Sequence, residues 1–459
     1  MNSVPAAARL QTILIWSIAL LAALFLVWPV WRAFFPMEIW GNEGWNAYHA
    51  DAAMRGAAQL YPPADGLTAN NYPPLSYYVM GWLGRLFGDP LYVGRAISIL
   101  STLFIGGIAA SIVRQFGGSR ASALLAGFWL VATLARFFEF YVGMNEPQLF
   151  GLAVMSAGFA WFWKRRADGR AVEPAVLVMV LAGFIKHNFI ALPLVALLWL
   201  WLENWRLGLR ATIVGAAAAA LGLAICAVMF APYFIPDMLF PRSTHLARGL
   251  STLGRLQFIL PAMVLWAIWA WHEHGRKIAR LSALLMVVAF VLCLVQKSGA
   301  GVDENAQFEL IFVTAIGIGV AYDGLLRDPL RTGWSRRTIG AVVLGILIIR
   351  LLISSRLEFA YVLFSPQYRA LAAEHAAITR AEAARTAAIP GPVACSNLVV
   401  CRMAGKPFVY DHFYVQMLVE TGRMTWAQVE QLARRKAIVK DTTDPRANVT
   451  SLWRRMRSD

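Results

Sequence analysis

The sequence predicts an all-α polytopic membrane protein with about eleven transmembrane helices and a small soluble α/β domain after them. Of the 459 residues, 59% are hydrophobic and only 15% are charged. A soluble domain of this size carries about 25% charged residues. Apolar runs of about 15 to 20 residues also recur along the chain, which is the length a helix needs to cross a bilayer.

Eleven apolar runs are expected to supply the helices of a membrane domain over residues 1–354. They cover residues 11–31, 96–116, 121–138, 147–163, 171–185, 189–203, 211–231, 256–271, 281–296, 307–322 and 338–354. No small-residue cleavage site follows the long first run, so we expect a retained helix and not a removed signal peptide.

The connections between these runs alternate in character, which predicts the orientation. The net charge of +16 lies mostly in short turns such as residues 164–166 and 276–280, and these are expected in the cytoplasm. The large first loop (residues 32–95) and the tail then lie outside, with the amino terminus in the cytoplasm and the carboxyl terminus extracytoplasmic. We expect a multi-pass protein of the cell inner (plasma) membrane, in contact with membrane lipids. The charge forms no single basic patch, so nucleic acid is not an expected partner.

The runs at 171–185 and 189–203 are short for a full span. Lys186-His187-Asn188 interrupts what would otherwise be one apolar stretch. Two arrangements satisfy this pattern: two short helices that meet at the outer surface, or a broken helix that lines a cavity, where polar backbone is tolerated at depth.

Residues 355–459 are expected to form the extracytoplasmic α/β domain. Strands are predicted at residues 393–395, 406–410 and 437–440, and a helix at 426–436 that is capped by Thr425. Cys395 and Cys401 lie six residues apart in this tail, where a disulfide can persist. Composition alone does not decide whether this disulfide forms.

The chemistry is expected among polar residues of the outer connections, and Glu43 is the first candidate. It stands within WGNEGW (residues 40–45), directly after the first helix. Tryptophans are typical of the membrane interface, and a carboxylate held there is suited to accept a proton. An interfacial acidic residue without a role is the alternative. Residues 44–57 are predicted to form an amphipathic helix that lies along the membrane.

Four further polar groups fall on the same side in this topology. They are Asn145-Glu146-Pro147, Lys186-His187-Asn188, Arg242 with His245, and Gly301-Val302-Asp303-Glu304-Asn305. Each has an ordinary structural explanation: a helix start before proline, a lysine that extends to the interface, contact with phospholipid headgroups, or acidic residues that favour a helix dipole. Their common placement on one side is the informative observation.

These motifs resemble those of the integral-membrane C-type (GT-C) glycosyltransferases, which use polyprenyl-phosphate sugars and include the aminoarabinose and mannosyl transferases. The match runs through nearly the whole chain in short, degenerate motifs. They are Asn42-Glu43-Gly44, NYPPL (residues 71–75) with Gly94-Arg95, Asn145-Glu146-Pro147, Lys186-His187-Asn188, residues 301–305 and Gly405-Lys406-Pro407.

The resemblance implies a GT-C-like membrane domain and assigns residue roles. The acidic residue of the family's first loop is the catalytic base, and a second acidic residue lies in the next outer loop; here these are Glu43 and Glu146. Many members carry two adjacent acidic residues in the first loop, whereas this chain has Asn42 beside Glu43. No metal site or other cofactor is therefore expected, and a divalent cation is not supported. The expected substrate-binding residues are Asn42, Lys186, His187, Arg242, His245, Asp303 and Glu304.

The expected reaction is inverting transfer of a sugar from a polyprenyl-phosphate donor to a glycan or lipid acceptor of the cell envelope. Such a displacement needs one carboxylate to deprotonate the acceptor hydroxyl, and cations to stabilise the leaving phosphate. One alternative is a transporter, which the scarcity of ionisable residues at mid-membrane depth disfavours. Another is a ligase that moves whole lipid-linked glycans.

Overall fold

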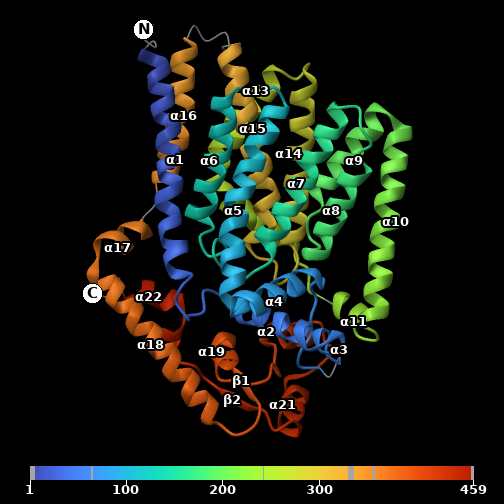
Figure 1. The fold of residues 1–459 in the computed structure, drawn as a ribbon, viewed down its shortest axis with the longest axis vertical. Coiled ribbons are helices and arrows are strands. Elements are labelled where there is room, and N and C mark those ends of the chain that lie inside the picture. Colours follow the sequence, from blue (N-terminus) through green and yellow to red (C-terminus); the bar gives the residue numbers. More distant parts are fainter. Residues whose placement is uncertain (1–5, 64–65, 241, 329–334, 354–356, 456–459) are drawn as a thin grey trace.

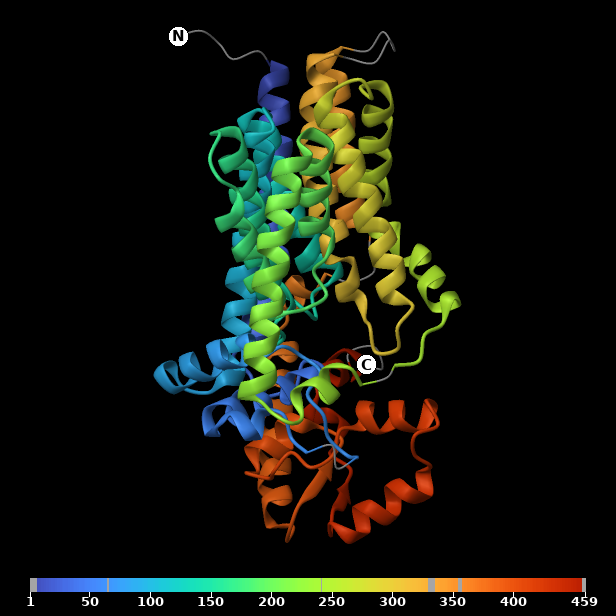
Figure 2. The same cartoon turned by 90° about the vertical axis from the view of Figure 1, so that its right-hand side faces the viewer.

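The computed structural model describes residues 6–63, 66–240, 242–328, 335–353 and 357–455 as a bundle of long helices with a compact tail at one end (Figure 1). The first turns of α1 (Ala6–Arg32) lie at the far end of the bundle. The short helices α2 to α4 and the tail helices α18 to α21 gather at the opposite end, which we call the tail end (Figures 1 and 2).

Each of the eleven predicted apolar runs falls on a helix of the bundle. These helices are α1 (Ala6–Arg32), α5 (Pro90–Gln115), α6 (Arg120–Phe137), α7 (Gln148–Ala167), α8 (Glu173–Ile185), α9 (Ala191–Glu203), α10 (Trp205–Met229), α13 (Leu260–His272), α14 (Lys277–Lys297), α15 (Phe308–Arg327) and α16 (Arg336–Leu352).

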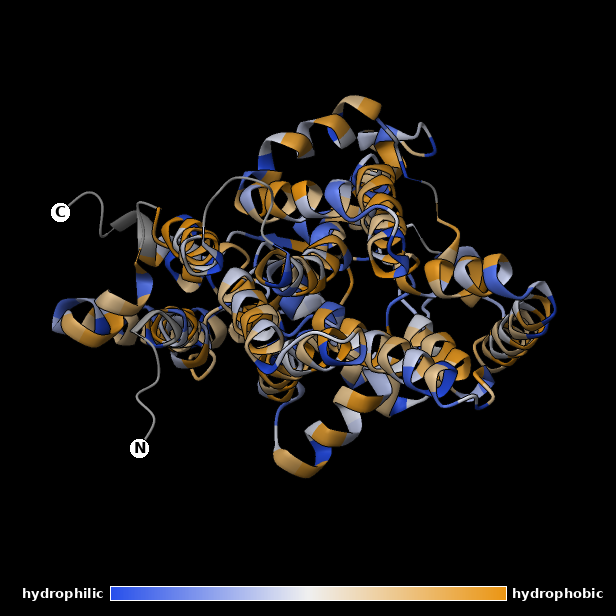
Figure 3. Ribbon diagram, turned by 90° about the horizontal axis from the view of Figure 1, so that it is seen from above, coloured by the Kyte–Doolittle hydropathy of each residue, from blue (hydrophilic) through white to orange (hydrophobic). Residues whose placement is uncertain are grey.

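The prediction of an integral membrane protein is confirmed, but the count of eleven spans is not. By length and composition, six helices of the described chain can cross a membrane: α1, α5, α6, α10, α14 and α15 together with its preceding turn. A seventh is present if the bent pair Leu246–Phe258 and Leu260–His272, which meet at 86°, counts as one span. The helices α8 and α9 and residues Thr338–Leu352 of α16 are apolar but shorter. Viewed along the bundle, hydrophobic residues cover most of the helical ribbon (Figure 3).

The helices differ in how far they are enclosed. All residues of α15 from Phe308 to Leu325 are buried, so this helix forms the centre of the bundle. Only 11% of an 18-residue apolar stretch of α10 is buried, so this helix is suited to face lipid. A helix that is apolar on every side can take either place, because lipid and protein core are equally apolar.

Short elements join the bundle to the tail. Those of the connections are α2 (Asn42–Arg55), α3 (Ala57–Leu60), α4 (Leu75–Phe87), α11 (Phe234–Met238), α12 (Leu246–Ser251), η1 (Thr252–Phe258) and η2 (Glu304–Gln307). Those of the tail are α17 (Glu358–Phe364), α18 (Pro366–Ala388), β1 (Val393–Cys395), α19 (Leu398–Met403), α20 (His412–Glu420), α21 (Trp426–Arg435), β2 (Val439–Asp441), η3 (Pro445–Ala447) and α22 (Val449–Arg455). The boundary predicted at residues 354–355 lies outside the described residues.

The tail has the predicted α/β character, with one strand fewer than expected. β1 pairs with β2 in parallel, with Val393 opposite Val439. Thr425 caps α21 in a capping box with Gln428. The strand predicted at residues 406–410 is wrong: this stretch has no regular secondary structure and pairs with no strand, and Pro407 lacks the N–H that a ladder needs. Cys395 and Cys401 form a disulfide with a Cα–Cα distance of 5.9 Å.

The helix predicted at residues 44–57 exists as α2, and protein covers most of it. Its residues from Glu43 to Ala50 are all buried. The tail helix α19 packs on it so closely that a Cβ on Gly44 would lie 2.6 Å from the backbone of Leu398. The apolar partner of α2 is therefore protein, which sequence periodicity cannot distinguish from lipid.

Candidate active site

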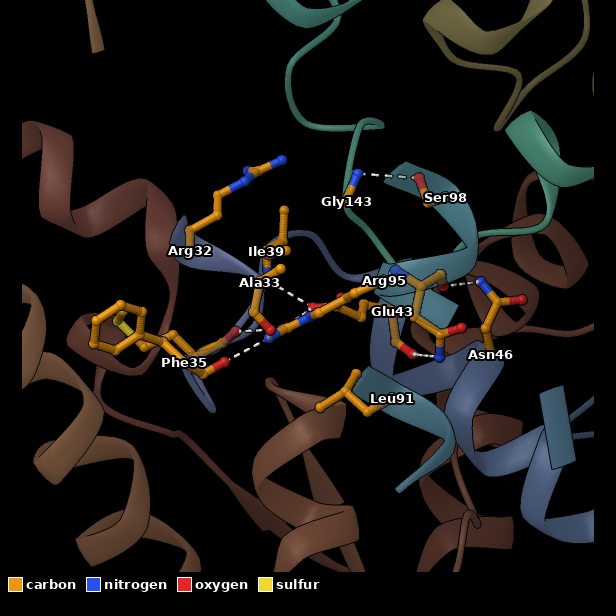
Figure 4. A network of polar contacts seen from close by, with 12 residues as sticks. Arg32, Ala33, Phe35, Ile39, Glu43, Asn46, Leu91, Arg95, Ser98 and Gly143 are labelled. Atoms are coloured by element: carbon orange, nitrogen blue, oxygen red, sulfur yellow. Dashed lines mark hydrogen bonds and ion pairs between the residues drawn. The ribbon is translucent and has the colours of Figure 1, made fainter. Parts of the chain in front are cut away.

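Glu43 lies in the first turn of α2 and is fully buried in an ion pair with Arg95 of α5 (Figure 4). Its Oε1 accepts from Arg95 Nε at 2.6 Å, and its Oε2 accepts from Arg95 Nη2 at 2.7 Å. The backbone N–H groups of Ile39 and Asn145 also donate to this carboxylate, at 2.9 and 3.1 Å. Four donors thus occupy the lone-pair positions of the Glu43 carboxylate.

Arg95 extends this network to the end of α1. Its guanidinium also donates to the carbonyls of Ala33, Phe35 and Met37, and so holds the chain that leaves the membrane (Figure 4). Its neighbour Gly94 makes room for the next loop, because a Cβ there would lie 1.8 Å from Asn145 Oδ1. Three motifs from separate parts of the sequence therefore meet at one buried point: Asn42-Glu43-Gly44, Gly94-Arg95 and Asn145-Glu146-Pro147.

Glu146 forms a second buried ion pair, with Lys186 at the break between α8 and α9. Lys186 Nζ lies 2.7 Å from Glu146 Oε1, and the Gln148 N–H donates to Oε2. The same Nζ lies 3.2 Å from the ring centroid of Tyr72, a cation–π contact. Since Lys186 binds a carboxylate and a ring, it is not merely a lysine that extends to the interface.

A polar cavity of about 380 Å³ opens at the tail end, and we call it the end pocket. Four regions supply its wall: the first loop, the loop after α11, the turn before α15 and the tail. The lining residues are Trp40, Gly41, Asn42, Trp45, Ala69, Asn71, Tyr72, Phe240, Arg242, Arg248, Gly301, Asp303, Ser396, Leu398, Asp411, His412, Phe413 and Tyr414.

Asp303 is the more exposed of the two carboxylates that line the end pocket. Its side chain is 41% exposed and accepts a hydrogen bond of 3.2 Å from the Tyr141 hydroxyl. Lys297 Nζ lies 3.9 Å from its other oxygen. Asp303 keeps lone pairs available to a molecule in the pocket, which a general base requires.

Asp411 is buried in the opposite wall. It accepts from Trp45 Nε1 and from the Tyr414 N–H, each at 3.0 Å. Burial raises the pKa of this carboxyl, and the same hydrogen bonds partly offset the effect. Asp411 thereby ties the tail to α2.

Two arginines place positive charge in the end pocket. The Arg242 guanidinium lies 5.2 Å from the Phe240 ring centroid and 5.7 Å from that of Phe413. Burial lowers its pKa from 12.5, which still leaves it a cation at neutral pH. Arg248 Nη2 lies 3.4 Å from the Val302 carbonyl. Neither arginine has a carboxylate partner within the described residues, so both are free to bind an anion.

An apolar groove of about 460 Å³ lies beside the end pocket, between α4, α8 and α10. Pro74, Leu75 and Tyr78 line it on one side, and Phe184 and Phe230 on the others. Residues 71–75 run from the wall of the end pocket to the wall of this groove. The walls of the end pocket and of the apolar groove are thus only a few residues apart in the sequence.

The structure brings together some of the predicted site residues and separates others. Asn42, Arg242 and Asp303 line the end pocket. Glu146 and Lys186 lie behind Tyr72, and the His187 ring centroid is 6.3 Å from that of Tyr72.

The remaining predicted residues lie outside the end pocket. Glu43 is not among the residues that line the end pocket, and its role as base stays a prediction. His245 lines a neighbouring hollow, and Glu304 pairs with Arg255 at 2.5 Å. Within the described ranges, no three His, Cys, Asp or Glu side chains are grouped so that they could hold a metal ion.

Sequence reasoning missed Asp411 and Arg248. Asp411 directly follows the stretch that was predicted to be a strand, and it caps α20. Its position against Trp45 depends on the docking of the tail, for which the sequence holds no local signal.

The fold and the end pocket define a polytopic membrane protein with a polar site at one end of its helices. No protein-family model matches the sequence, and no match was found among curated proteins. Among solved structures, ArnT from Cupriavidus metallidurans in the apo state is similar over 92% of this chain and 90% of that chain, with a TM-score of 0.58 at 16% identity.

The Archaeoglobus fulgidus oligosaccharyltransferase in the apo form is similar over 93% of this chain and 69% of that chain, with a TM-score of 0.54 at 10% identity. AglB from the same organism, in complex with an inhibitory peptide and a dolichol-phosphate, gives a TM-score of 0.52 at 10% identity, over 94% of this chain and 69% of that chain. The chain therefore has the GT-C fold, as its motifs led us to expect.

Proposed function

We propose that this protein is a membrane glycosyltransferase that transfers a sugar, a hexose or a pentose, from a polyprenyl-phosphate donor to a cell-envelope glycan or lipid. The reaction takes place at the tail end, on the extracytoplasmic face of the inner membrane. The GT-C fold supports this class of activity.

The observation that carries the proposal is the adjacency of the end pocket and the apolar groove. A polyprenyl-phosphate sugar has an apolar tail, an anionic centre and a polar sugar. The groove between α4, α8 and α10 suits the tail. Arg242 and Arg248 suit the phosphate, since both line the end pocket. The aromatic rings of Trp40 and Trp45 offer faces on which a sugar ring packs.

In the reaction, the acceptor hydroxyl oxygen forms a bond to the anomeric carbon while the bond from that carbon to the phosphate oxygen breaks. The phosphate leaves with the electron pair, and the arginines stabilise its added negative charge. The hydroxyl proton goes to a carboxylate. The family resemblance assigns this role to Glu43. The exposure of Asp303 in the pocket favours Asp303 instead.

The test is a transfer assay with purified protein in lipid nanodiscs. A labelled polyprenyl-phosphate sugar and a membrane extract are the substrates, and the label is followed into product. We expect labelled product of one added sugar with inverted anomeric configuration. Transfer of a whole oligosaccharide in one step would identify the ligase instead. In a parallel assay with the protein in sealed vesicles, passage of label into the vesicles without product would identify a transporter.

A further inference from the structure

A second polar hollow lies on the other side of α2 and shares no lining residue with the end pocket. It measures about 700 Å³, and α2, the chain after α3 and residues 405–408 of the tail enclose it. We call it the α2–tail pocket. The side chains of Trp45 and His49 are in contact, with ring centroids 4.1 Å apart and planes tilted by 43°, and they form the partition between the two pockets, because Trp45 lines one and His49 the other.

His49 presents a hydrogen-bond acceptor to this pocket. The side chain is 3% exposed, and Nδ1 lies 2.8 Å from the carbonyl of Trp45. A carbonyl only accepts, so Nδ1 carries the proton and Nε2 of the neutral ring has a free lone pair. Burial lowers the pKa of His49 to about 4, which keeps the ring neutral at pH 7. Nε2 has no hydrogen-bond partner among the described residues, and it lies on the ring edge turned away from the helix backbone.

The charges of the α2–tail pocket do not balance. Arg402 pairs with Asp51 at 2.7 Å and with Asp89 at 2.8 Å. Lys406 Nζ donates only to backbone carbonyls, of Ile389 and Gly391. Arg55 is exposed and donates only to the side chain of Gln59, at 2.9 Å. Within the described chain, Arg55 and Lys406 have no carboxylate partner, so the pocket is suited to an anion.

The remaining wall suits a sugar ring. Tyr48 and Phe408 stack with centroids 5.4 Å apart, and both line the pocket. The C–H faces of a pyranose pack on such rings, while its hydroxyls need acceptors such as His49 Nε2. A volume of this size is in the range that binds ligands of several rings.

We propose that the α2–tail pocket binds an anionic saccharide, whose carboxylate or phosphate group contacts Arg55 and Lys406 and one of whose hydroxyls donates to His49. Resting on the proposed function, this saccharide is a remote part of the acceptor, because the acceptor hydroxyl that reacts has to reach the donor in the end pocket, beyond the Trp45–His49 partition.

The test is calorimetric titration of the whole chain in phosphatidylcholine nanodiscs with trigalacturonate, glucose 1-phosphate and neutral maltotriose. We expect at least one anionic probe to bind about tenfold or more tightly than maltotriose. Arg55→Gln should weaken that probe about tenfold, while Arg423→Gln, which removes an exposed tail arginine outside the pocket, should not. His49→Phe keeps the ring packing and should weaken all three probes.

The inference is overturned if neither anionic probe binds more tightly than maltotriose, or if Arg55→Gln and Arg423→Gln have equal effects. The transfer assay separates this outcome from failure of the proposed function. Binding of an anionic probe by a protein that transfers no sugar supports the anionic-saccharide site and contradicts the glycosyltransferase activity. Sugar transfer without such binding supports the activity and contradicts the site.

Discussion

At the scale of single residues, two roles are open to Glu43: general base and structural ion-pair partner. They require different surroundings of its carboxylate. A general base needs a lone pair that faces substrate, whereas all positions on the Glu43 carboxylate are taken by Arg95 and two backbone N–H groups. That arrangement stabilises the start of α2 and the end of α1. A substitution at Glu43 therefore has to be followed by stability as well as by activity.

We expect Glu43→Gln to lower the free energy of unfolding by about 3–5 kcal/mol, because it leaves Arg95 charged and buried without its partner. Thermal unfolding in nanodiscs measures this. The double variant Glu43→Gln/Arg95→Gln removes both charges and should recover part of the loss. If the folded double variant transfers sugar at the wild-type rate, Glu43 takes no part in the chemistry.

Asp303→Asn keeps the shape of the side chain but cannot accept a proton. If Asp303 is the base, transfer should fall by about 100- to 10,000-fold with donor binding intact. Glu304→Gln is the matched control, since this neighbour pairs with Arg255 outside the end pocket. Equal rates for Asp303→Asn and wild type would show that Asp303 is not the base and would leave Glu43 and Glu146 as the candidates.

His49 should make stability depend on pH. Its pKa is lowered from 6.5 in the unfolded chain to about 4 in the folded chain, so protonation favours unfolding. The stabilisation is complete above pH 6.5 and is lost as the pH falls toward 4. At pH 5 the loss is about 2 kcal/mol. His49→Phe should remove this part of the pH dependence of the melting temperature, while replacement of the exposed His245 should leave it in place.

At the scale of elements, the break between α8 and α9 shows how a helix end is stabilised from a distance. Both oxygens of Glu309, in α15, accept from the backbone N–H groups of Ile190, Ala191 and Leu192 at 3.0–3.1 Å. Glu309 therefore caps the start of α9 and not its own helix. A carboxylate at this place satisfies N–H groups that have no partner within the helix.

Glu309→Ala should lower the free energy of unfolding by about 1–2 kcal/mol, because it leaves these buried donors unsatisfied. Thermal unfolding is again the measurement. Glu430→Ala, which removes an exposed glutamate paired with Arg434, should change stability by less than about 1 kcal/mol. Similar losses in both variants would contradict the capping role.

The elements also show which structural features can be predicted from the sequence and which cannot. Helix positions followed from apolar runs, and Thr425 marked the start of α21, because both signals are local. The burial of α2 and the missing strand at residues 406–410 depend on how the tail docks, which no local pattern records. The same holds for the site: Asp303 was found because it opens an apolar run, whereas Asp411 was missed.

At the scale of the whole molecule, two sets of connections lie at opposite ends of the bundle. The first loop and the tail share one end, and the first turns of α1 lie at the other (Figure 1). Together with the basic turns, this predicts which end faces the cytoplasm. Reporter fusions after Arg166 should read cytoplasmic, and fusions after Gly88 extracytoplasmic. The reverse result would move the end pocket to the cytoplasmic face.

The end pocket joins residues from nearly both ends of the sequence, since Trp40 and Asp411 stand in its wall together. A ribosome making this chain delivers the first loop early, then every apolar helix, and only afterwards Ser396, Asp411 and Phe413. Until those last residues emerge and settle against α2, the membrane holds an inserted bundle with an open, unfinished pocket. The wall of the end pocket is thus completed late in synthesis, and a chain halted before residue 396 would occupy the membrane with this pocket incomplete.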